Sequence, residues 1–148
     1  MSRVRRILFP SDFSRGSGAA FARAVRMAKA DRAQLMIAHV LAPVVPIAGE
    51  GYISPQVYDD LETSGRKYAQ RRLNAVQAKA RKAGVRATTL VLEGVAHEQI
   101  IRAAKSKKAD LIVMGTHGHT GLVKFFLGSV ASRVVAGAHC PVLTVRGR

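Results

Sequence analysis

Short apolar runs alternate with longer stretches of helical periodicity along this chain, and this alternation constrains the fold more than any other feature. The runs are residues 4–9, 34–41, 87–92, 110–114 and 141–145. Leu111 to Met114 is apolar at every position, which is typical of a strand covered on both faces of a parallel sheet. Helices between parallel strands form right-handed crossovers. The pattern therefore predicts an α/β domain, doubly wound and flavodoxin-like, with a five-stranded parallel sheet and helices on both faces.

Four stretches predict the helices. The first carries Phe21, Ala24, Val25 and Ala28 on one stripe, with Ser14 or Ser17 as its N-cap. The others are expected at about 55–83, 96–107 and 129–138, and Gly84 is the expected C-terminal stop of the helix at 55–83. Residues 42–56 contain three prolines and two glycines, so an irregular segment is expected there.

Length and cysteine content indicate one cytoplasmic domain over residues 1–148. A chain of this size buries roughly 70% of its unfolded surface, so its core needs neither disulfides nor metals. The lone Cys140 has no partner within the chain, which fits a reducing compartment. Only a short apolar run precedes Pro10, and no segment approaches the roughly 20 apolar residues of a membrane span. No membrane partner is expected.

The formal net charge of +15 makes polyanions candidate partners. Aromatic residues are only 5% of the chain, and no basic stretch is interleaved with rings that could stack on bases. Specific recognition of nucleic acid is therefore the less favoured interpretation, although a basic nucleic-acid-binding module stays open as an alternative. The basic series from Arg66 to Lys82 is typical of a solvated helix face.

A glycine-rich loop follows the most apolar run. It contains Gly115, Gly118 and Gly121, and Gly128-Ser129 then opens the fourth expected helix. Glycines let backbone amides turn toward a ligand, and a helix N-terminus favours an anion. A helix N-terminus contributes only about 0.3–1 kcal/mol, whereas micromolar affinity needs about 8 kcal/mol. A phosphate site here therefore needs several amide hydrogen bonds and a buried base as well.

Two other strand ends supply candidate contacts to a nucleoside. Ligands of open α/β sheets bind beyond the carboxyl ends of the strands, where the topology reverses. Asp12 follows the first run and places a carboxylate where a ribose hydroxyl could donate to it. The backbone of Val40, at the end of the second run, could read an adenine edge.

The chain resembles the universal stress protein family, in its nucleotide-binding subset, over essentially its whole length. That subset carries Gly, two residues, Gly, nine residues, then Gly followed by Ser or Thr, which Gly115, Gly118 and Gly128-Ser129 match. The segments Ala109 to Gly115 and Cys140 to Leu143 are also similar. The resemblance implies a sheet of order 3-2-1-4-5 and homodimers joined through the last strand, Pro141 to Val145. It also implies a set of nucleotide-binding residues: Pro10, Asp12, Val40, Met114, Gly115, Gly118, Gly128, Ser129 and Val130.

One candidate site residue departs from the family pattern. His119 stands where relatives usually carry Arg or Lys facing the phosphates. Because histidine changes charge near neutral pH, its presence predicts altered phosphate affinity and pH-sensitive binding.

These features together predict an adenine-nucleotide-binding regulator that acts in the stress response and holds ATP, or else AMP or ADP. No Walker loop and no carboxylate beside the glycine loop are found, so no catalytic residues are assigned and at most slow ATP hydrolysis is expected. Mg²⁺ would be coordinated mainly by the phosphates. His117, His119 and His139-Cys140 lack the spacing of a zinc site, so no protein metal site is expected. The enzymatic alternative is an adenylyl-transfer enzyme on the same scaffold.

Overall fold

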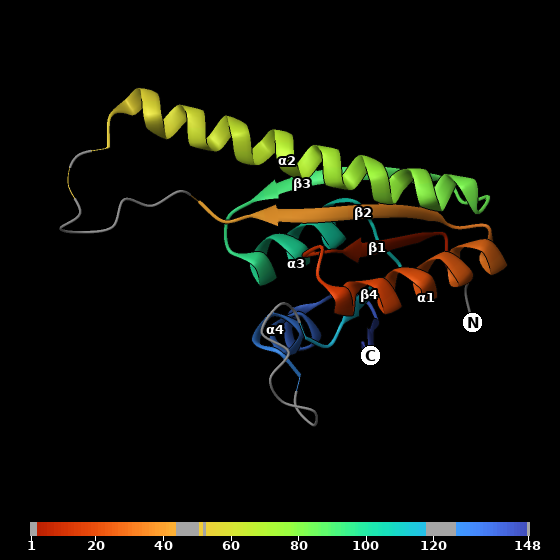
Figure 1. Cartoon of the computed structure of the whole chain (residues 1–148). Helices are drawn as coiled ribbons and strands as arrows, with labels where there is room; N and C mark the ends of the chain where they lie inside the picture. The colour runs from red at the N-terminus through yellow and green to blue at the C-terminus, as the bar shows by residue number, and fades with distance from the viewer. Residues whose placement is uncertain (1–2, 44–50, 52, 118–126, 148) are drawn as a thin grey trace.

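The structure is a computed structural model that describes residues 3–43, 51, 53–117 and 127–147. Within these residues, five strands alternate with four helices (Figure 1). The elements in chain order are β1 (Arg6–Pro10), α1 (Arg15–Asp31), β2 (Gln34–Leu41), α2 (Pro55–Lys82), β3 (Ala87–Glu93), α3 (Ala96–Ser106), β4 (Leu111–Gly115), α4 (Ser129–Gly137) and β5 (Val142–Val145).

The sheet has the order β3-β2-β1-β4-β5, and all of its paired strands are parallel. This confirms the flavodoxin-like fold and the predicted strand order. Ile7 of β1 pairs with Leu35 of β2 on one side and with Leu111 of β4 on the other. The chain leaves β1 toward β2 and β3 and later returns to β4 and β5. The direction of winding therefore reverses between β1 and β4.

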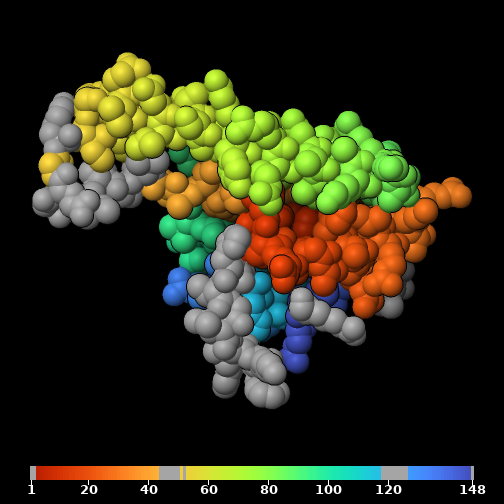
Figure 2. Space-filling view, viewed as in Figure 1, coloured from red at the N-terminus to blue at the C-terminus, as the bar shows by residue number. Residues whose placement is uncertain are grey.

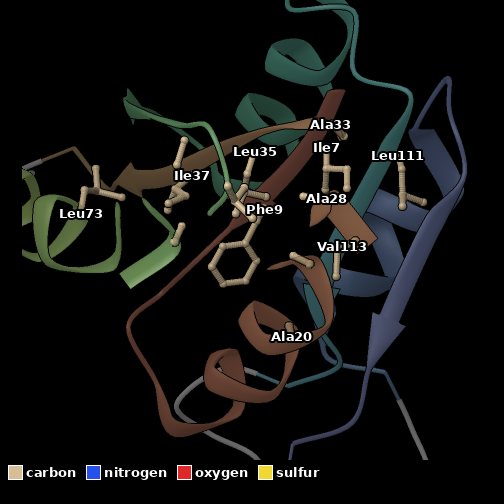
Figure 3. Packing of buried hydrophobic residues seen from close by; sticks show 14 residues of the cluster. Ile7, Phe9, Ala20, Ala28, Ala33, Leu35, Ile37, Leu73, Leu111 and Val113 are labelled. Atoms are coloured by element: carbon tan, nitrogen blue, oxygen red, sulfur yellow. The ribbon is translucent and has the colours of Figure 1, made fainter. Parts of the chain in front are cut away.

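Alternate residues of the central strands face two separate apolar layers. On one face, Phe9, Leu35 and Val113 pack with α1 and α2, and Figure 3 shows this cluster from close by. On the other face, Leu8 and Ile112 pack with α3 and α4. Because both faces of the sheet are covered, β1 and β4 are buried along nearly their whole length. The expectation of helices on both faces is confirmed.

The second helix begins at Pro55, as predicted, so the irregular segment ends at residue 54 rather than at residue 56. The Ser54 side chain accepts a hydrogen bond from the Val57 N–H at 3.2 Å. Pro55 occupies the first helical position, where the fixed φ of proline already matches that of a helix. Residues 44–50 and 52 of that segment lie outside the described residues. The helix ends as predicted, with Gly84 at φ +90°. In Figure 2, α2 forms a long ridge along one side of the molecule.

None of the helices in the described residues combines the length and the apolar composition that a membrane span requires.

Candidate functional site

A hollow of about 220 Å³ opens at the carboxyl ends of β1 and β4, where the winding reverses. Its walls come from the ends of three neighbouring strands and from the beginnings of α1, α3 and α4. The described residues that line it are Pro10, Ser11, Asp12, Ser17, His39, Val40, Ala96, Ile100, Met114, Gly115, Thr116, His117, Gly128, Ser129, Val130 and Ala131.

Most of the residues predicted from the sequence meet in this hollow. Pro10 and Asp12 lie at the end of β1, and Val40 lies near the end of β2. The predicted residues from the second half of the chain are Met114, Gly115, Gly128, Ser129 and Val130, and all of them line the same space. Gly118 and His119 lie outside the described residues. The predicted convergence of distant segments is therefore observed for the eight described residues, whereas their binding role stays a prediction.

One wall of the hollow holds buried polar side chains, although most of the lining is apolar. Among the described residues, the buried polar side chains are Ser11, Ser17 and Thr116, and all three line the hollow. The Ser17 hydroxyl donates to the Ser14 carbonyl at 2.7 Å, and the Ser11 hydroxyl lies 3.3 Å from the Ser17 hydroxyl. Buried polar groups are retained where hydrogen bonds satisfy them. This polar wall suits a ligand that carries hydroxyl groups.

The two glycines that border the hollow permit close backbone packing. The Gly128 N–H donates to the Thr116 carbonyl at 2.7 Å and so joins the end of β4 to the beginning of α4. A Cβ on Gly128 would lie 3.0 Å from that carbonyl oxygen, and a Cβ on Gly115 would lie 3.4 Å from the Gly16 carbonyl oxygen. A side chain at Gly128 would press on this backbone, whereas one at Gly115 would make an ordinary van der Waals contact.

The first turn of α4 offers backbone donors to the hollow. Ser132 N–H already donates to the Gly128 carbonyl at 2.9 Å, which is the first hydrogen bond of the helix. The N–H groups before it, on Ser129, Val130 and Ala131, have no intrahelical acceptor because they belong to the first turn. All three residues line the hollow. This arrangement favours an anionic group at that wall.

His39 is a lining residue that the sequence assigned only to a strand end. Its Nδ1 lies 2.7 Å from the Ser11 carbonyl oxygen. Because a carbonyl only accepts, Nδ1 carries the proton, and Nε2 is an acceptor when the ring is neutral. The imidazole ring of His39 stacks on the Phe13 ring, with centroids 4.3 Å apart. The Arg72 guanidinium lies over the same Phe13 ring, 5.0 Å from its centroid. This stack fixes His39 at the wall of the hollow.

His117 contributes a buried polar atom without a partner. Its Nδ1 lies 2.9 Å from the Thr116 hydroxyl, whereas its Nε2 is buried and has no hydrogen-bond partner within the described residues. A buried polar atom of this kind is uncommon, and an additional polar group beside it would satisfy it. This unpartnered atom and the first-turn amides of α4 suit a ligand with polar groups.

Comparison with known proteins shows the family of this chain. The model of the universal stress protein family matches residues 3–146. The chain belongs to that family. A universal stress protein of Methanocaldococcus jannaschii is 40% identical over 144 residues, covering 96% of this chain and 82% of the relative. Among solved structures, a universal stress protein from Lactobacillus plantarum is similar, with a TM-score of 0.83, 27% identity and coverage of 99% and 100%. Another, in complex with cAMP, has a TM-score of 0.74, 25% identity and coverage of 98% of both chains.

The charge of this universal stress protein is not concentrated at the hollow. Among its described lining residues, Asp12 is the acid, and none is Lys or Arg. The described residues also contain no group of three or more His, Cys, Asp or Glu side chains that could hold a metal ion. The described lining therefore offers an anion backbone amides but no Lys or Arg side chain.

Cys140 is predicted to be a slow nucleophile. Burial raises the pKa of its thiol, and the negative charge of Asp110 raises this pKa further. Less thiolate is then present at neutral pH, and alkylation by iodoacetamide should be slower than for an unstructured cysteine peptide. The rate measured against pH should rise at a higher pH than for the peptide, and Asp110→Asn should move the profile back toward it. A profile that coincides with that of the peptide would contradict this prediction.

Proposed function

We propose that this universal stress protein binds an adenine nucleotide, in the first place ATP, and acts as a regulator in the stress response. The observation that carries the proposal is the single hollow that brings together the first-turn amides of α4, the exit of β4 and the ends of β1 and β2. The cAMP complex of a related protein supports it, because that ligand contains the same base and sugar.

The hollow suggests how the nucleotide would be oriented. The apolar residues Val40, Ile100 and Met114 suit the base, and the backbone of Val40 could read its edge. Asp12 and the buried serines suit the ribose hydroxyls, and Gly128 and Ser129 suit the phosphates. Ligand pockets typically measure about 300–1,000 Å³. A volume of about 220 Å³ therefore suits the nucleoside, with the phosphates at the rim beside α4.

Binding rather than catalysis is the proposed activity. Asp12 is the carboxylate among the described lining residues, and its Oδ1 already accepts the Ser14 N–H at 2.9 Å. Activation of water for attack on a phosphate requires a positioned base or water-orienting group. We expect at most slow hydrolysis, with Mg²⁺ held mainly by phosphate oxygens.

The proposal extends to assembly and location. Strand β5 is an edge of the sheet, since it pairs with β4 alone among the described strands. An edge strand presents unpaired N–H and C=O groups that can pair with a second copy. We therefore propose a homodimer joined through β5, and sedimentation analysis should show twice the mass of one chain. A cytoplasmic location remains the expectation from the sequence.

The binding proposal is tested on the purified full-length protein. Mass spectrometry of the small molecules released on denaturation should find an adenine nucleotide, and calorimetry on protein freed of that ligand should show one ATP site per chain. Calorimetry that detects no heat with ATP, ADP, AMP or cAMP would overturn the proposal. Rapid release of pyrophosphate from ATP would instead identify an adenylyl-transfer enzyme.

Asp12→Ala is expected to weaken ATP binding about tenfold without abolishing it. A hydrogen bond to a charged group contributes about 1.5–3 kcal/mol, and partial exposure of Asp12 places the effect near the lower value. Asp12→Asn keeps an oxygen that can accept the Ser14 N–H, so it separates loss of the turn from loss of the carboxylate. Calorimetry on both variants measures the effect, and unchanged affinity in Asp12→Ala would remove this residue from the site.

A further inference from the structure

Half of the basic residues of the chain gather at the end of the sheet opposite the hollow. This end is formed by residues 3–6, 29–34, 79–88 and 105–110, which precede or begin β1, β2, β3 and β4. We call it the basic end. Its twelve Lys and Arg side chains are all exposed, and two acids, Asp31 and Asp110, accompany them. The bases are Arg3, Arg5, Arg6, Lys29, Arg32, Lys79, Arg81, Lys82, Arg86, Lys105, Lys107 and Lys108.

Backbone hydrogen bonds show that these segments meet in space. Gln34 N–H donates to the Arg5 carbonyl, Leu35 N–H to the Arg86 carbonyl and Asp110 N–H to the Arg6 carbonyl, each at 2.8 Å. Neighbouring strands lie about 4.8 Å apart. The beginnings of β3, β2, β1 and β4 therefore form a row about 14 Å long that carries cations from every strand. The ends of α1 and α2 reach this end at the right of Figures 1 and 2.

The positive charge at this end is not neutralised by the protein itself. The described ion pair of the chain joins Arg66 and Glu93, and none of the twelve bases takes part in a salt bridge within the described residues. The Asp110 carboxylate accepts the backbone N–H groups of Arg5 and Arg6, both at 2.9 Å. The C-termini of α1, α2 and α3 each contribute roughly half a negative charge. These partial charges are small beside an excess of ten cations over acids.

Two of the twelve bases, Arg32 and Lys108, have an unusual backbone conformation. After α1 and after α3, the chain turns through Arg32 at φ 54° and Lys108 at φ 55°, in the left-handed region that favours glycine. The equivalent turn after α2 uses Gly84 at φ +90°. Two of the three turns thus place a long cation where glycine would be less strained. Strain retained in this way points to a use for the side chain.

We propose that the basic end binds the phosphate backbone of duplex nucleic acid without reading its sequence. A row of exposed Arg and Lys side chains matches a line of phosphates, and such contacts supply most of non-specific binding. Few aromatic residues are needed for this mode, which agrees with the composition. None of the exposed large apolar side chains in the described residues belongs to the four segments of this end. The absence of an apolar anchor among them favours nucleic acid over a protein or a membrane surface.

The test uses the full-length protein and a fluorescent DNA duplex of about 20 base pairs with arbitrary sequence, followed by anisotropy from about 50 to 200 mM salt. Wild type should bind, with log K falling at a slope of about 3–4 against log salt. The double variant Arg32→Gly with Lys108→Gly should bind about tenfold more weakly, with the slope reduced by about 2. Because glycine suits both φ angles, loss of folding does not explain such a result.

The control variant removes the same charge elsewhere. Lys67→Gln with Arg71→Gln lies on the exposed face of α2, outside the basic end. It should retain most of the affinity, since these residues do not belong to the row. Equal weakening in both double variants would show a general effect of net charge and overturn the proposal. Failure of wild type to bind the duplex would also overturn it, including the case in which phosphatidylserine vesicles are bound instead.

Discussion

Gly128→Val is expected to weaken ATP binding at least about 100-fold while the protein remains folded. Gly128 has φ −62° and ψ 163°, a conformation that valine also adopts, so the effect arises from space rather than from the backbone angles. The added Cβ would lie 3.0 Å from the Thr116 carbonyl oxygen, so the backbone beside the proposed phosphate position would have to shift. Loss of two charge-assisted hydrogen bonds, each worth about 1.5–3 kcal/mol, accounts for the size of the change.

Calorimetry with ATP measures this effect, and a urea titration shows whether the variant is folded. Gly65→Val is the matched control, because a Cβ at Gly65 in α2 meets no atom within 4 Å. It should bind ATP as wild type does. A folded Gly128→Val protein with wild-type affinity would place the phosphates elsewhere. Binding of the DNA duplex should be unchanged in Gly128→Val, so the nucleotide and nucleic-acid proposals can fail separately.

Phe9→Ala is expected to lower the free energy of unfolding by about 3–5 kcal/mol. Phe9, labelled in Figure 3, is only 1% exposed. Its ring packs against that of Phe21, with centroids 5.7 Å apart. A cavity at this position of β1 would leave the layer beneath α1 unfilled. Since domains of this kind are stable by about 5–15 kcal/mol in total, the variant should lose a large part of its stability.

Urea denaturation followed by circular dichroism measures the change as a lower midpoint with an unchanged slope. Phe21→Ala removes the same side chain from a half-buried position on α1 and should have a smaller effect. Phe9 does not line the hollow, so the folded fraction of Phe9→Ala should keep its nucleotide affinity. A loss below about 1 kcal/mol would show that the layer under α1 closes around the cavity.

The elements of the fold were predictable because their signals are local. Leu111 to Met114 indicated a strand buried on both faces, and Gly84 indicated the end of α2. Pro55 indicated the beginning of α2, although the irregular segment was expected to continue to residue 56, because the same proline ends that segment and starts the helix. The strand order came from the family resemblance, since periodicity alone does not state which strands are neighbours.

The candidate site was predictable only in part. Glycine spacing drew attention to Gly115 and Gly128, and a carboxylate at a strand end drew attention to Asp12. No comparable signal marked His39. Its place at the wall depends on stacking with Phe13, in the loop before α1, and on Arg72, which lies 59 residues beyond Phe13 in the sequence. Thr116 was missed because a polar residue after a strand is ordinary until the fold buries it.

The sequence by itself determined where strands and helices form, since the periods of 2 and 3.6 residues are properties of neighbouring positions. It also determined that the chain carries a large excess of positive charge. Only the tertiary structure decided that the ends of β1 and β4, about 100 residues apart, would enclose one hollow, and that four basic segments would meet at the opposite end. The reason is that a parallel sheet places the beginnings of all its strands at one end of the sheet and the ends of all its strands at the opposite end. This holds whatever the separation of the strands along the chain.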